Sequence, residues 1–329
     1  MNRNSALDIA KYIAALLVIG IHTRPLADLS TEADFWLVEV LCRLAVPFFA
    51  VCSGFYLYPA SSNLQNNRSF RQTWVKIVSM YVGWSVFYLL IHLYQWYDSD
   101  TLCPEYLFGW VKGSIVNCSY FHLWYFVALI YGMLWYWMVC RFIKPKYWPI
   151  LIIALWSLEV LAYGYRSYVP QLHAYYAIWD ALSSIAVSFT RMLPLLLLGS
   201  WIAYAKPRLS LTWLIMATII CLIGLCIEVS FLHQHGAERF SYVILTLPMS
   251  CILFCTLFRV GEKLHFNSRL FAKISLVVYC IYPAIIFLLN CLSVQLPPHY
   301  VFLIVSIISS IFGIIYVLLK KQLIITYHN

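Results

Sequence analysis

The sequence predicts an all-α integral membrane protein, a bundle of about ten transmembrane helices, and three observations support this. Of the 329 residues, 63% are hydrophobic, only 11% are charged, and the mean hydropathy is +0.80. An ordinary soluble domain has about 25% charged residues, so the composition excludes a soluble enzyme, a disordered chain and a nucleic-acid-binding protein. The chain also contains 25 Tyr and 13 Trp, residue types that are enriched at membrane interfaces.

Ten apolar segments are long enough, or nearly so, to cross a hydrocarbon core of about 30 Å as helices. In lipid a helix satisfies its own backbone hydrogen bonds, whereas stretches such as LPLLLLG lack the alternation of a barrel strand. The ten segments are 6–24, 36–58, 74–97, 122–140, 149–165, 190–205, 211–229, 241–258, 274–292 and 299–319.

The distribution of Lys and Arg predicts that both termini are cytoplasmic. With the N-terminus inside, 15 of the 22 Lys and Arg residues fall on the inner side of the membrane. This asymmetry is the one that orients membrane helices. The five residues that fall on the outer side are Arg24, Lys112, Arg166, Arg191 and Arg239.

Two long segments between spans fall on the outer side. Residues 98–121 contain Cys103 and Cys118, which form either an external disulfide or two free thiols. Residues 166–189 are rich in aromatic residues, and we expect part of this segment to form a short amphipathic helix at the membrane interface.

No Cys/His spacing indicates a metal. We therefore expect one transmembrane domain, 1–329, with no soluble domain, no metal and no cleavable signal peptide.

The first span contains charged and titratable residues, which mark function by default because they are costly to bury in lipid. Lys11 and His22 are eleven positions apart, so they share one helix face, about 16 Å apart along the axis. This arrangement is typical of the wall of a passage. His22 has the chemistry of a general base or of a transient acyl carrier; the alternative is a hydrogen-bonded interface histidine. Asp8 is expected to neutralise Lys11.

The second span carries an i, i+4 pair, Glu39 and Arg43, which can form an ion pair. The pair either contacts substrate or holds two helices together. Pro47 is expected to kink this helix or to free a carbonyl group, as in helices that line cavities. Ser53 and Gly54 permit close approach of a second helix.

Two arginines precede the third span on the inner side. Arg68 and Arg71 are spaced i, i+3, and two guanidinium groups at this spacing suit a phosphate-bearing ligand. The alternative is that they only obey the charge rule for cytoplasmic loops.

Several short motifs follow one another in a specific order along the chain. They are LDIAK at 7–11 with the Lys-x10-His pair of Lys11 and His22, VPFFAVCSGF at 46–55, Arg68-x-x-Arg71, HLWYF at 122–126, RMLPLLLLG at 191–199 and SLVVYCIYP at 275–283. This pattern resembles the acyltransferase 3 family of bacterial integral membrane acyltransferases, over nearly the whole chain. It is most similar to the small stand-alone members and to the membrane half of membrane-bound serine racemases.

The chain departs from the family pattern at two positions and in its length. Lys11 stands where Arg is more common, which the pattern allows. Tyr282 stands where His is frequent, so this helix is not expected to supply a second catalytic imidazole. Without a fused periplasmic domain, the membrane domain is expected to bind the acceptor itself or to hand it on.

The resemblance implies a multi-pass O-acyltransferase, expected to be an O-acetyltransferase, in the bacterial inner membrane. Its donor would be cytoplasmic acetyl-CoA or another acyl-CoA, and its acceptor a hydroxyl of a glycan or other small molecule on the outer side. His22 would be the catalytic residue, Lys11 and Asp8 would line the donor path, and Arg68 and Arg71 would hold the CoA phosphates.

The competing function is a transporter or exporter of a small polar solute such as an amino acid, which could use the same passage. A purely structural scaffold explains the intramembrane charges poorly. Trp124 and Tyr125 either shape the outer mouth or belong to an aromatic belt. The candidates for the cavity lining are Glu39, Arg43, Ser53, His122, Trp124 and Tyr125.

Overall fold

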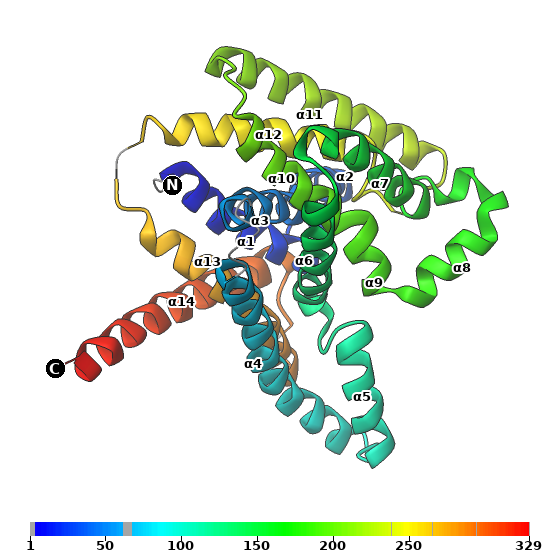
Figure 1. Ribbon diagram of the computed structural model, residues 1–329. Helices are drawn as coiled ribbons and strands as arrows, with labels where there is room; N and C mark the ends of the chain where they lie inside the picture. The colour runs from blue at the N-terminus through cyan, green and yellow to red at the C-terminus, as the bar shows by residue number, and fades with distance from the viewer. Residues whose placement is uncertain (1–3, 62–67, 238, 265, 294, 329) are drawn as a thin grey trace. The chain divides into compact units, whose positions relative to one another are not determined.

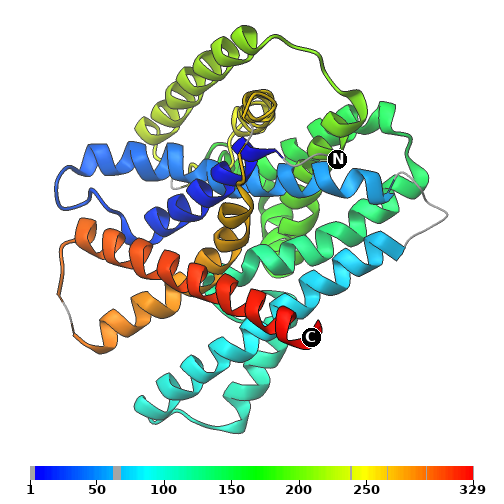
Figure 2. The same ribbon diagram turned by 90° about the vertical axis from the view of Figure 1, so that its left-hand side faces the viewer.

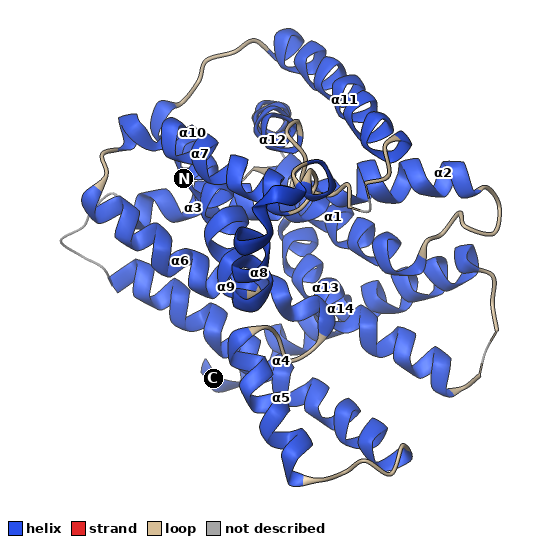
Figure 3. Ribbon diagram, turned by 90° about the vertical axis from the view of Figure 1, so that its right-hand side faces the viewer, coloured by secondary structure: helices blue, strands red, loops and turns tan. Residues whose placement is uncertain are grey.

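The computed structural model describes residues 4–61, 68–237, 239–264, 266–293 and 295–328 (Figure 1). These ranges are helical and contain no strand (Figure 3). The predicted all-α class is therefore confirmed. The helices form because apolar runs of this length can meet their backbone hydrogen bonds only within themselves when they lie in lipid.

Nine helical stretches in the described ranges are long and apolar enough to cross a membrane. Some are single α-helices, and others join short π and 3-10 turns (labelled η) to a longer helix. They are α1 (Ser5–Thr23); α2 (Thr31–Phe35) with η1 (Trp36–Leu41), η2 (Cys42–Leu44) and α3 (Ala45–Ser61); α4 (Arg68–Asp98); α5 (Pro104–Val116) with η3 (Phe121–Leu123) and α6 (Trp124–Phe142); η4 (Pro145–Tyr147) with α7 (Trp148–Ala162); α9 (Ser184–Val187) with η7 (Ser188–Met192) and α10 (Leu193–Ala205); α11 (Leu211–Gln234); α13 (Arg269–Cys291); and α14 (Pro298–His328).

Each of the ten predicted apolar segments coincides with a helix. The segment 241–258 corresponds to α12 (Thr246–Gly261), which is apolar but has only 16 residues. At 1.5 Å per residue such a helix spans about 24 Å, less than the hydrocarbon core. The orientation of the termini stays a prediction.

The chain divides into two compact units, which are described separately. The first consists of residues 1–49, 209–231 and 248–329, and the second of residues 50–208 and 232–247. The single-domain expectation stays a prediction.

In the first unit, α1 packs along α13 and α14, and these two form a hairpin (orange and red in Figure 2). The start of α1 is fixed by side chains. Asn4 accepts from the backbone N–H of Leu7 at 3.1 Å and donates to the carbonyl of Phe258 at 2.7 Å. Ser5 donates to the carbonyl of Phe266 at 2.9 Å. The N-cap of α1 is thereby tied to the end of α12.

The second span changes helix type before Pro47, while the kink or free carbonyl expected at Pro47 stays a prediction. A π turn, η1, passes into a 3-10 turn, η2, and α3 then continues through Pro47. Proline has no N–H to offer the carbonyl of Arg43 four residues earlier. Turns of this kind are where long helices bend, and here they set the directions of the polar side chains on η1 and η2.

In the second unit, α3 and α10 cross with their backbones in contact. A Cβ atom at Gly54 would clash with the carbonyl of Leu196, and one at Gly199 would clash with the carbonyl of Val51. Ser200 donates to the carbonyl of Gly54 at 2.7 Å. The close approach predicted at Gly54 is confirmed, and it follows the small-residue rule for helices in lipid.

The two long segments assigned to the outer side are both partly helical. Segment 98–121 contains the helix α5, which the sequence analysis treated as a polar loop. Cys103 and Cys118 flank this helix, and both are free thiols in the structure. Segment 166–189 contains the short turns η5 (Arg166–Tyr168) and η6 (Pro170–Leu172) and the helix α8 (His173–Leu182). Helix α8 buries Tyr176 and Trp179 and exposes most of its other side chains, so a short amphipathic helix is present as predicted.

Candidate functional site

His22 lies in the last turn of α1, and its side chain is exposed. One face of the imidazole stacks on Tyr282 of α13, with ring centroids 5.6 Å apart and planes 28° apart. Tyr282 is fully buried, at 0% exposure. The position where the family frequently has His therefore lies directly against His22. A buried ring thus packs against the imidazole, while His22 as a whole keeps exposed surface.

The predicted ion pair of the second span is present beside His22. Arg43 Nε donates to Glu39 Oε2 at 3.0 Å, and Nη2 approaches Oε1 at 3.4 Å. Both side chains keep some exposure, 30% for Arg43 and 12% for Glu39. The Arg43 guanidinium also interacts electrostatically with His22. A base and a paired cation are thus brought together in the first unit, and both residues keep exposed surface.

An aromatic row continues from His22 along the same unit. Tyr282 lies 6.5 Å from Tyr279, and Tyr279 lies 6.5 Å from Phe49, measured between ring centroids. Phe49 comes from the VPFF motif, the tyrosines from the SLVVYCIYP motif, and His22 from the first span. Three motifs that are far apart in the sequence meet at one place.

The inner part of α1 holds the other two predicted donor-path residues. Asp8 is buried at 4% exposure and accepts a hydrogen bond from Ser268 Oγ at 2.7 Å. Lys11 is half-buried. Because α1 is unbroken from Ser5 to Thr23, Lys11 and His22 share a helix face as the spacing predicted. Mutual neutralisation of Asp8 and Lys11 stays a prediction.

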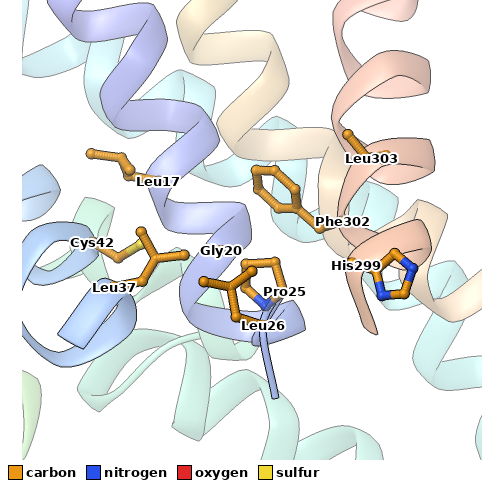
Figure 4. Close-up of a pocket in the computed structure, with 9 residues that line it drawn as sticks. All are labelled: Leu17, Gly20, Pro25, Leu26, Leu37, Cys42, His299, Phe302 and Leu303. Carbon is orange, nitrogen blue, oxygen red and sulfur yellow. The ribbon is translucent and has the colours of Figure 1, made fainter. Parts of the chain in front are cut away.

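A pocket in the first unit is apolar and lies between α1, the start of the second span and the start of α14 (Figure 4). Its volume is about 320 Å³, and it is lined by Leu17, Gly20, Pro25, Leu26, Leu37, Cys42, His299, Phe302 and Leu303. Gly20 lies about 160° around the helix from His22. His299 at its edge pairs with Asp28 at 2.7 Å. This opening therefore does not expose the imidazole.

Arg68 and Arg71 belong to the second unit, where both are exposed in the first turn of α4. Residues 62–67, which precede this pair, lie outside the described part of the chain.

The remaining cavity candidates also lie in the second unit and make three separate sets of contacts. Ser53 Oγ and Tyr125 Oη are 3.5 Å apart. His122 is only 1% exposed and lies edge-on to Tyr88, with centroids 4.9 Å apart. Its surroundings are those of a packed aromatic cluster. Trp124 lies 5.4 Å from the guanidinium carbon of Arg191.

Arg191 belongs to a buried hydrogen-bond network with Glu159 and Thr190 that was not predicted from the sequence. Arg191 Nε donates to Glu159 Oε1 at 2.7 Å, Nη2 donates to the same oxygen, and Thr190 Oγ1 donates to Oε2 at 2.6 Å. The side chains of Arg191 and Glu159 are 6% and 0% exposed. Arg191, counted on the outer side from the sequence, lies on η7 within the candidate span Ser184–Ala205; its side of the membrane stays a prediction. Glu159 could have been noticed as the single charged residue of segment 149–165.

Aromatic rings close this network. The guanidinium carbon of Arg191 lies 3.5 Å from the ring centroid of Tyr242 and 4.8 Å from that of Tyr163. Such cation–π contacts are strongest where the cation is desolvated. Among the described residues, no group of three or more His, Cys, Asp or Glu side chains could hold a metal ion.

Comparison with known proteins identifies the family. The acyltransferase 3 family model, described as an acyltransferase domain, matches residues 4–318. An amino-acid racemase of Enterococcus faecalis is 26% identical over 308 residues, covering 90% of this chain and 43% of the relative. A serine/alanine racemase of Enterococcus gallinarum is 29% identical over 257 residues, covering 75% of this chain and 36% of the relative.

The chain spans less than half the length of these curated relatives. No solved structure matches it. The family match nevertheless extends over both compact units and over all nine stretches that can cross a membrane. The chain therefore belongs to the acyltransferase 3 family and is a multi-pass membrane protein.

Proposed function

We propose that this protein transfers an acyl group, acetyl in the first instance, from cytoplasmic acyl-CoA to a hydroxyl group of a sugar or other small acceptor on the outer side of the membrane. The observation that carries the proposal is the accessible imidazole of His22 beside the Glu39–Arg43 pair. Ester formation by an acyltransferase needs a base to accept the hydroxyl proton and a positive group to stabilise the negative charge that develops.

The reaction needs one proton acceptor and one group that stabilises negative charge. His22 takes the proton of the acceptor hydroxyl while the hydroxyl oxygen attacks the thioester carbonyl carbon. The carbon–sulfur bond then breaks, the ester forms, and the CoA thiolate leaves and regains the proton. Arg43 supplies positive charge where the carbonyl oxygen becomes negative. In the covalent variant, His22 attacks the thioester itself and passes the acyl group on.

Two further features support a CoA donor. Arg68 and Arg71 are both exposed, and paired guanidinium groups suit phosphate groups. Lys11 lies on the same face of α1 as His22, where it would line the path of the pantetheine arm.

The function is tested with purified protein in proteoliposomes that receive labelled acetyl-CoA and a mixture of neutral sugars. We expect label to appear in an O-acetyl ester, and we expect acetyl-CoA to raise the melting temperature. If label never leaves CoA with any acceptor, and if CoA does not stabilise the protein, the enzyme proposal fails.

The arginine pair is tested separately in the same assay. Changing both Arg68→Ala and Arg71→Ala should raise the KM for acetyl-CoA about a hundredfold or more, because each of the two lost phosphate contacts costs about 1.5 kcal/mol or more. The matched control changes Lys76→Ala, another exposed cation of α4. An unchanged KM with normal protein abundance would leave the pair a topological signal only.

A second candidate is transport of an amino acid. It is favoured by the names of the relatives, which are racemases of amino acids, and by the part of their length that this chain matches. Stabilisation by serine or alanine together with none by CoA would favour this candidate over the enzyme.

A further inference from the structure

The second unit carries an open pocket, lined by charged and apolar groups together, that the proposed chemistry does not use. Its volume is about 370 Å³, within the usual range of small-molecule sites. One face of α8 forms one side, and the η5–η6 segment forms the other. The pocket is lined by Arg166, Pro170, His173, Tyr176, Ala177 and Asp180.

The sequence places these groups on one side of α8. His173, Tyr176, Ala177 and Asp180 follow the i, i+3, i+4, i+7 pattern, which aligns side chains on a single helix face. Tyr176 is buried, and its hydroxyl donates to the carbonyl of Val169 at 2.8 Å. The tyrosine ring is therefore a fixed part of the pocket wall.

A bidentate ion pair forms part of the pocket lining. Arg166 Nη1 donates to Asp180 Oδ1 at 2.9 Å, and Nη2 donates to Oδ2 at 2.7 Å. The Arg166 guanidinium also lies 4.7 Å from the ring of Tyr176. The hydrogen bonds from Arg166 lower the pKa of Asp180, and those to Asp180 raise the pKa of Arg166. Both groups thus stay ionised near neutral pH and cancel each other's charge.

The chemistry of these groups selects a particular class of ligand. The ion pair contributes no net charge, yet it keeps N–H donors on Arg166 and oxygen acceptors on Asp180. The imidazole of His173 adds a further hydrogen-bonding group, and Pro170 and Ala177 add apolar surface. A hydroxyl group both donates and accepts, so it can use this set without separating the ions. A charged ligand would have to compete with the bidentate pair, whose fork geometry is favourable.

We propose that this pocket binds a neutral polyhydroxyl compound, a sugar unit, as the acceptor of acyl transfer. The role of this sugar as acyl acceptor rests on the proposed function, whereas sugar binding to the pocket does not depend on it. Segment 166–189 was predicted on the outer side of the membrane, where the acceptor is expected.

The test is saturation-transfer NMR on the full-length protein in nanodiscs. The probes are D-glucose, D-galactose and N-acetyl-D-glucosamine, with serine and inorganic phosphate as charged competitors. Ala177→Trp fills the pocket from an exposed position. Ala174→Trp, also exposed on α8 and outside the pocket lining, is the matched control. We expect a saturation-transfer signal on at least one sugar. This signal should fall at least tenfold in Ala177→Trp and change less than twofold in Ala174→Trp.

Three results would overturn the proposal: no saturation-transfer signal on any of the sugars, an equal signal in both tryptophan variants, or displacement of the sugar by serine or phosphate at equal concentration. The acyl-transfer assay separates this failure from failure of the enzyme proposal. If His22→Ala abolishes transfer while Ala177→Trp leaves the KM for the sugar unchanged, only the pocket assignment is wrong. If acyl transfer is never seen but Ala177→Trp removes the NMR signal of sugar binding, only the enzyme proposal is wrong.

Discussion

The two units each carry an Arg–Glu pair in a membrane-spanning stretch, and the pairs differ in access. In the first unit, Arg43 and Glu39 are 30% and 12% exposed. In the second, Arg191 and Glu159 are 6% and 0% exposed. Charges are costly inside a membrane in either case. The difference lies in whether protein groups alone satisfy them.

In the closed pair, protein groups occupy both carboxylate oxygens. Glu159 accepts from Arg191 on one oxygen and from Thr190 on the other, and aromatic rings cover the guanidinium. This leaves no face for a ligand, so we assign the pair to holding α7 against η7. In the open pair, Glu39 and Arg43 come from one stretch of helix and keep some exposed surface, and Arg43 interacts electrostatically with His22.

Both pairs involve a π turn, which is often found at functional sites. Glu39 lies on η1, and Thr190 and Arg191 lie on η7. On η7 the π turn aims two consecutive side chains at one carboxylate. On η1 it adjoins a 3-10 turn that carries Arg43. A π turn therefore does not identify an active site by itself; exposure of the polar groups is needed as well.

The largest effect on stability is expected from Glu159→Gln. It leaves the Arg191 cation buried without its counterion, which typically costs about 3–5 kcal/mol. The melting temperature and the folded yield in detergent should fall sharply, while the transfer rate per folded molecule should not. A melting temperature like that of the unchanged protein would show that the closed pair does not hold the second unit together.

A smaller effect on stability, with a larger one on activity, is expected from Glu39→Gln. This pair is partly exposed, and such pairs contribute about 1 kcal/mol or less. The melting temperature should therefore change little, while the transfer rate per folded molecule should fall because Arg43 is no longer oriented beside His22. If the rate stays normal and the protein unfolds readily, the roles of the two pairs are reversed.

The smallest effect is expected from the exposed pair of Asp180 and Arg166. The pKa of Asp180 is lowered in the folded protein, so its contribution to stability is complete above its ordinary pKa of 3.8 and is lost as the pH falls through the lower folded-state value. Asp180→Asn should therefore melt slightly earlier than the unchanged protein between pH 5 and 8. The gap should disappear only in strong acid; a gap that instead closes near neutral pH would contradict this assignment.

Much of the fold could be predicted from the sequence because long apolar runs and i, i+4 spacings are local signals. The ten segments and the Glu39–Arg43 pair are of this kind. The buried Glu159–Arg191 pair could not be found in this way, since its partners lie on different elements 32 residues apart. The contact of His22 with Tyr282 likewise depends on the packing of α1 against α13. The helix α5 was missed because its flanking residues are polar.

The central claim is that the reachable imidazole performs the chemistry. The most direct measurement is the initial rate of acetyl transfer per folded molecule in His22→Ala, compared with His299→Ala. His299 is the matched control, a half-buried histidine of the first unit that pairs with Asp28. A lost general base typically costs about 10²–10⁴-fold in rate. We therefore predict at least a hundredfold loss in His22→Ala and less than a twofold change in His299→Ala. A His22→Ala rate within twofold of the unchanged protein would contradict the account.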